Sequence, residues 1–130
     1  MFGSNYLGGA YFAGQQLLLS LGVPTWVSPL NHASPINQTT ELVFLIPQGQ
    51  ANLHFEIQLD KVNTFNGANL QSIKSWVSQT GWQYYNGSIW TPIPSTGVDP
   101  SYAGSQAKFT IQIALSVGVW YRRIRGRVLI

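Results

Sequence analysis

The fold of this chain is decided by residues 107–130, which read AKFTIQIALSVGVWYRRIRGRVLI. In residues 108–115, apolar side chains alternate with polar or small ones, and this period of two predicts a half-buried strand. Residues 116–118, Ser-Val-Gly, predict a short turn. Alternation resumes after the turn, where Trp120 and Ile124 share one phase. The stretch therefore predicts two strands that form an antiparallel hairpin.

The second of these strands carries most of the positive charge. Arg123, Arg125 and Arg127 share the outward phase with Tyr121, while Arg122 takes the inward one. Alternate residues of a strand lie about 6.6 Å apart on one face, so the outward arginines predict a basic contact face. Its partner could be an acidic protein, a nucleic acid backbone or the outer surface of an assembly. Aromatic residues interleave only once, which favours a protein over a nucleic acid; a solvated edge that prevents aggregation is the alternative.

The order of residue types in this stretch resembles the penultimate strand of fibronectin type III and related immunoglobulin-like sandwiches. The residues that carry the resemblance are Leu115, Gly118, Trp120, Tyr121, Arg123, Ile124 and Arg125. In those domains, an aromatic residue near the start of the strand clamps the preceding turn. The resemblance implies a sandwich of two antiparallel sheets. In it, the strand from Val119 onward is either the last strand or an exposed edge that awaits a partner.

Charge is scarce in this chain and is concentrated in one place. Charged residues make up 8% of the 130 residues, against about 25% in typical proteins. The net charge of +3 hides an asymmetry, because four of the seven cations lie in residues 122–127. A surface with so few charges is poorly protected against association, and we expect other subunits to cover much of it. The chain has no cysteine, which excludes disulfides, and we predict neither a signal peptide nor a membrane anchor.

The first 22 residues combine glycines with large aromatic side chains. We predict that residues 1–22 form an extended arm that lies across a neighbouring subunit, because glycine disfavours an independent fold while aromatic rings anchor well. The expected anchors of this assembly arm are Tyr6, Leu7, Tyr11 and Phe12. A frayed terminus or an ordinary first strand of the domain is the alternative.

The middle of the chain supplies further strands. Residues 41–46 are apolar in both phases, as in a strand that is covered on both faces. Residues 52–61 alternate cleanly, and we predict that they pair with residues 41–46. Their inward side chains are Leu53, Phe55, Ile57 and Leu59, and their outward ones are His54, Glu56, Gln58 and Asp60. Residues 23–37 predict a first edge strand broken by turns, and residues 62–79 predict a loop with a helical turn or a short edge strand.

An aromatic hairpin follows. Asn86-Gly87 is the dipeptide that a type I′ turn requires, and aromatic residues flank it on both sides. These residues are Trp82, Tyr84, Tyr85 and Trp90. Exposed rings could stack on sugars, whereas buried rings would seal the end of the core or an interface. Together with residues 107–130, this hairpin predicts an all-β fold: an antiparallel immunoglobulin/fibronectin III-like β-sandwich of six or seven strands in residues 23–130.

The sequence offers little for catalysis. His54, Glu56 and Asp60 alternate on one strand and could present a metal-binding or acid/base surface. A solvated strand face is the favoured interpretation, because no second histidine or carboxylate cluster completes a site. We therefore predict a protein that is not an enzyme, with no catalytic residue, no metal ligand set and no cofactor.

Taken whole, the chain is similar to small structural proteins of tailed bacteriophages that carry an immunoglobulin-like or fibronectin-like sandwich. The stretches that carry this likeness are TWVSPLNHASPI, LHFEIQLDKVNTF, GWQYYNGSIWTPIP, AKFTIQIALSVGVWYRRIRG and the N-terminal YLGGAYFAG. The resemblance implies a virion component, such as a capsid decoration, head-fibre or tail protein, present in many copies on the capsid exterior or the tail. Its partners would be copies of itself and other virion proteins, with no membrane.

Two alternatives remain open at this stage. The aromatic hairpin would suit a carbohydrate-binding module that recognises a cell-surface glycan. The coverage of a charge-poor surface by neighbouring subunits would equally suit a subunit of an extracellular filament.

Overall fold

The computed structural model describes residues 22–28, 33–35 and 40–128. The predicted assembly arm, with Tyr6, Leu7, Tyr11 and Phe12, lies outside these residues except for Gly22. The described residues contain one short 3₁₀ turn, Pro100–Tyr102, and otherwise strands and loops. No helix in this part of the chain is long and apolar enough to cross a membrane.

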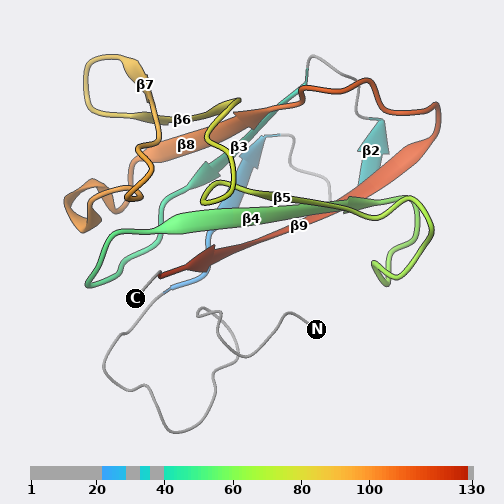
Figure 1. The fold of residues 1–130 in the computed structure, drawn as a ribbon, viewed down its shortest axis with the longest axis horizontal. Coiled ribbons are helices and arrows are strands. Elements are labelled where there is room, and N and C mark those ends of the chain that lie inside the picture. The colour runs from blue at the N-terminus through green and yellow to red at the C-terminus, as the bar shows by residue number, and fades with distance from the viewer. Residues whose placement is uncertain (1–21, 29–32, 36–39, 129–130) are drawn as a thin grey trace, which may run out of the picture.

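The strands form two antiparallel sheets (Figure 1). The five-stranded sheet has the order β1 (Thr25–Ser28), β3 (Glu41–Leu45), β8 (Gln106–Thr110), β6 (Trp82–Tyr85), β7 (Trp90–Pro92). The four-stranded sheet has the order β2 (Ala33–Pro35), β9 (Val119–Arg127), β4 (His54–Asp60), β5 (Gln71–Lys74). The predicted all-β, antiparallel fold is confirmed. The described residues form nine strands rather than the predicted six or seven. Two of the nine, β2 and β7, are only three residues long, too short to show an alternating pattern in the sequence.

The hydrophobic core lies between the two sheets. Phe44 of β3 and Phe55 of β4 meet edge to face with ring centroids 4.9 Å apart, which joins one sheet to the other. Trp82 of β6 packs beside both rings and beside Phe109 of β8. Burial of each such side chain contributes about 1.5–3 kcal/mol. The predicted inward set of residues 52–61, Leu53, Phe55, Ile57 and Leu59, is confirmed, because each is 0% exposed. This shared core makes the two sheets a β-sandwich.

The predicted hairpin of residues 107–130 is wrong. β8 pairs with β3 and β6, whereas β9 pairs with β2 and β4, so the chain passes from one sheet to the other between them. The apolar alternation that predicted a longer first strand continues beyond the ladder: Ile111 is buried, but Ile113 is 72% exposed. A hydrogen bond stabilises the segment that connects β8 to β9: the Trp120 indole N–H donates to the carbonyl oxygen of Ser116 at 2.9 Å. An aromatic residue near the start of β9 therefore does clamp the preceding turn.

The predicted pairing of residues 41–46 with residues 52–61 is also wrong. β3 and β4 face each other across the core instead of lying side by side. Both strands have an apolar face. That face meets the core whether the two strands lie side by side in one sheet or opposite each other in two sheets. Within residues 62–79, the short edge strand proves to be β5, whose one partner among the described strands is β4.

The aromatic hairpin is confirmed, but its turn type is not. β6 and β7 pair with Tyr85 opposite Trp90, which leaves a four-residue loop at Asn86–Ile89. A type I′ turn needs positive φ at both central residues, and of the dipeptide only Gly87 has it, at 101°. The Asn86 side chain instead accepts hydrogen bonds from the backbone N–H groups of Ser88 and Ile89, at 2.9 and 3.0 Å. This side-chain bonding stabilises the longer loop.

Candidate functional site

The outward face of β4 is not the solvated surface that its charges predicted. His54, Glu56 and Asp60 are 1%, 1% and 0% exposed. They are buried because neighbouring loops and the side chains of β9 cover this face. Each of the three belongs to a different polar network. No group of three His, Cys, Asp or Glu side chains in the described ranges is placed to hold a metal ion.

His54 lies in a chain of hydrogen bonds that defines its tautomer. Its Nε2–H donates to the carbonyl oxygen of Ser95 at 2.9 Å, so Nδ1 accepts from the hydroxyl of Ser75 at 2.8 Å. The Ser75 oxygen itself accepts the backbone N–H of Phe55 at 2.9 Å. Burial lowers the pKa of His54 below its ordinary value, and the nearby charge of Arg127 lowers it further, although the bond to Ser95 opposes both. The imidazole is therefore held neutral as a structural link, not presented as a ligand or base.

Asp60 stabilises the loop that follows β4. Its carboxylate accepts backbone N–H groups from Lys61 at 2.7 Å and from Gly67 at 2.8 Å. These bonds satisfy the carboxylate without any metal ion. The loop places Phe65 beside the outer face of the sheet, where its ring lies 4.4 Å from the guanidinium of Arg123.

The arginines of the predicted basic contact face lie against the protein's own side chains. Arg123 donates to the side-chain oxygen of Gln58 at 2.7 Å. Arg125 binds the Glu56 carboxylate, and Arg127 lies over the ring of Trp76 at 4.6 Å. Four cations, Lys74 and these three arginines, thus share the outer face of the four-stranded sheet with two carboxylates, Glu56 and Asp60. The face is positively charged, yet Arg125 is only 9% exposed.

Arg122 lies in the inward phase, as its position predicted. It is 2% exposed and its guanidinium lies 4.6 Å from the ring centroid of Trp26 in the opposite sheet. Burial lowers the pKa of Arg122, but an arginine stays protonated at neutral pH. A cation over an aromatic face is a favourable way to accommodate such a charge between two sheets.

The four aromatic residues of the hairpin separate into two pairs. Trp82 is 1% exposed in the core, and the Tyr84 ring packs on Tyr102 with centroids 4.9 Å apart. Tyr85 and Trp90 lie on the outer side, 5.6 Å apart and at 65° to each other. This second pair lies on the face of the sheet that points away from the core, where it can meet a ligand. The Nζ of Lys108 lies 4.3 Å from the Trp90 ring and is paired with Glu41 at 3.0 Å, so charged and polar groups adjoin the rings.

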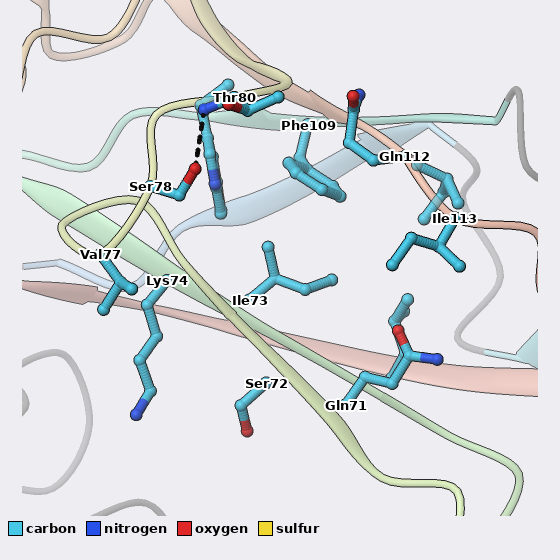
Figure 2. Close-up of a pocket in the computed structure, with 13 residues that line it drawn as sticks. Gln71, Ser72, Ile73, Lys74, Val77, Ser78, Thr80, Phe109, Gln112 and Ile113 are labelled. Atoms are coloured by element: carbon cyan, nitrogen blue, oxygen red, sulfur yellow. Dashed lines mark hydrogen bonds between the residues drawn. The ribbon is translucent and has the colours of Figure 1, made fainter.

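An apolar cleft that the sequence did not predict opens between the sheets beside β5. Its volume is about 520 Å³. Figure 2 shows Ile73 of β5 and Phe109 of β8 pointing toward one another across it, with Ile113 at its side. Leu59, Trp82 and Ile111 are among its other lining residues. Two apolar residues of the cleft, Val77 and Ile113, are each 72% exposed.

The backbone edge of β5 borders the same cleft. Among the residues that the structure describes, β5 pairs with β4 on one side and with no strand on the other. The backbone N–H of Ser75 donates to the carbonyl oxygen of Phe55 at 3.0 Å, which places residues 71, 73 and 75 with their peptide groups toward β4. Because successive residues of an antiparallel strand turn their peptide groups to opposite sides, Ser72 turns its N–H and C=O to the open edge. The site thus combines an apolar surface with a strand edge that is left open by the described strands.

The local signals for this cleft were present but ambiguous. The alternation of residues 108–115 placed Ile113 in the core, whereas the chain leaves the ladder after Thr110 and exposes it. Val77 lies in the turn after β5, where no periodicity marks it as exposed or buried. Comparison of the chain with protein families, with curated proteins and with solved structures finds no match.

Proposed function

We propose that the protein is a non-enzymatic structural subunit whose sandwich associates with copies of itself and with other proteins of a larger particle. The observation that carries this proposal is the apolar cleft beside β5, with exposed Val77 and Ile113 and a strand edge that no other described strand pairs with. Exposed apolar surface and open edges are features that soluble monomers normally avoid, and they suit association. The low charge of the chain supports the same function.

The particle that we propose is the virion of a tailed bacteriophage, with the protein on the capsid exterior or the tail. The sequence resemblance supports this, as does the sandwich of two antiparallel sheets, which we propose to be of the immunoglobulin or fibronectin III kind. The contact of Trp120 with the turn at Ser116 fits that kind of fold.

Sedimentation velocity of the purified protein over a wide range of concentration tests the association. We expect the sedimentation coefficient to rise with concentration toward an oligomer. A monomer at every concentration would overturn the proposal. Mass spectrometry of purified virus particles tests the location, and a protein that is absent from particles but recovered from surface filaments would favour the filament alternative.

Carbohydrate binding is a second candidate, favoured by the outer pair Tyr85 and Trp90. Two rings on one sheet face with adjoining Gln83, Glu41 and Lys108 offer both stacking and hydrogen bonds to a sugar. We expect glycan-array binding that is lost in Trp90→Ala and kept in Ile89→Ala, since Ile89 is exposed in the neighbouring loop. The absence of binding by the wild-type protein would exclude this candidate.

A further inference from the structure

The cleft beside β5 has the shape and chemistry to accept an extended, uncharged, apolar segment. Ile73, Phe109 and Ile111 form its apolar surface. The open backbone of Ser72 supplies a donor and an acceptor of the kind that pairs with an added strand. Addition of a strand to an exposed edge, with alternate side chains inserted into pockets, is a general mode of peptide recognition.

The chain itself carries such a segment ahead of its first described residue. Residues 15–21 read QQLLLSL and contain no charge. Leu17, Leu19 and Leu21 are spaced by two, so an extended backbone would turn all three to one face. The three leucines would then face the apolar side of the cleft, and Leu18 and Ser20 would face away from it.

The geometry of the described residues decides which copy supplies the segment. The backbone N–H of Gly22 donates to the carbonyl oxygen of Gln48 at 3.1 Å, just beyond β3. The cleft lies at the other end of that strand, because Phe109 pairs with Leu42. Leu42 and Gln48 are six positions apart in the sequence, which corresponds to at most about 20 Å at the rise of a strand.

The segment as a whole cannot lie in the cleft of its own chain. Residues 17–21 directly precede Gly22, so Leu21 reaches about 4 Å from it and Leu17 about 18 Å even when fully extended. Leu17 alone approaches the cleft of its own chain, whereas Leu21 stays far from it, so the three leucines cannot occupy that cleft together. A second copy of the chain has no such restriction.

We propose that residues 17–21 of a second copy dock in this cleft as an added strand beside β5, with the leucines of one face inserted between the sheets. The inference rests on the proposed function, because it names the contact by which the subunits associate. Each copy would offer one segment and one cleft, so the contact is head-to-tail and propagates unless the arrangement closes into a ring.

Two full-chain variants test the contact from its two sides. Leu19→Asp places a charge on the docking segment and leaves the cleft intact. Ile113→Asp places a charge beside the cleft and leaves the segment intact, and Ile113 is exposed enough to accept it without loss of folding. The matched control is Ile89→Asp, at a residue that is 63% exposed but lies in the β6–β7 loop away from the cleft.

We expect each of the two variants to weaken self-association by at least about a hundredfold, since a carboxylate would enter an apolar site without a partner. The control should associate as the wild type does. An equimolar mixture of the two variants should form a dimer, because the intact segment of Ile113→Asp can enter the intact cleft of Leu19→Asp. This rescue requires both proteins to be folded, so it also excludes misfolding as the cause of the loss.

The outcomes separate this inference from the proposed function. If the wild type associates but either variant does so equally well, or the mixture stays monomeric, the docking contact is wrong while the structural function stands. If the wild-type protein is monomeric at every concentration, both are overturned.

Discussion

Glu56 and Arg125 face each other on neighbouring strands and share two hydrogen bonds. The Oε1 atom of Glu56 accepts from Nε of Arg125 at 3.0 Å and from Nη2 at 2.8 Å. The two residues are direct partners in the register of β4 and β9. Their side chains are only 2% and 11% exposed. This is a buried ion pair on the face of the sandwich that the sequence assigned to solvent.

Loss of the Glu56 carboxylate should destabilise the protein strongly. Glu56→Ala leaves the Arg125 guanidinium buried beside other cations, and breaking a buried pair in this way costs about 3–5 kcal/mol. Glu41→Ala is the matched control, because the Glu41 side chain is 50% exposed in its pair with Lys108. An exposed pair of that kind contributes less than about 1 kcal/mol. Urea unfolding of both variants measures the difference, and equal losses would show that the Glu56 pair is effectively solvated.

The outer face of β4 shows how far a local pattern can be trusted. The period of two correctly separated Leu53, Phe55 and Ile57 from the polar set between them. The pattern could not show that this polar set is buried, because its cover comes from distant residues. Phe65 and Trp76, in the loop and turn on either side of β5, and Arg125 of β9 are brought there only by the tertiary fold.

Residues 107–130 show the same limit for topology. Alternation identified both strands, but it cannot show whether they pair within one sheet or pack across the core. In either arrangement the apolar face of each strand points into the core. The decisive feature was the connection between them, where Lys61 donates to the carbonyl oxygen of Val117 at 2.9 Å and Trp120 binds Ser116. The cleft beside β5 was missed for a related reason: Ile113 follows the period of β8 but lies beyond its last paired residue, Thr110.

His54 should make the stability of the protein depend on pH. Its pKa is lowered in the folded state by burial and lies at its ordinary value of 6.5 in the unfolded chain. As the pH falls below 6.5, the unfolded chain takes up a proton that the folded protein resists, so stability is fully present above 6.5 and declines below it. Protonation at Nδ1 would also displace the hydroxyl hydrogen that Ser75 donates.

The variant His54→Gln isolates this contribution. We expect it to be less stable than the wild type at neutral pH, because the bonds to Ser75 and Ser95 are disturbed, but to lose less stability on acidification. Unfolding free energies measured from neutral pH down to about pH 5 give the two curves. Their difference reports His54 alone, since His32 is present in both proteins. Parallel curves would show that His54 titrates alike in the folded and unfolded states.

Gly97 and Gly87 allow backbone strain to be separated from steric exclusion. Both have positive φ, 93° and 101°, a conformation that costs a residue with a side chain about 1–2 kcal/mol. A Cβ at Gly87 would meet nothing within 4 Å, whereas one at Gly97 would lie 2.8 Å from the carbonyl oxygen of Leu53. That oxygen accepts the backbone N–H of Val98 at 2.8 Å, so the chain at Leu53 cannot move away without breaking a bond. Gly97→Ala should therefore cost about 1–3 kcal/mol more than Gly87→Ala in urea unfolding. Equal costs would mean that the bridge between Leu53 and Val98 yields easily, and that strain in the turn alone determines the loss.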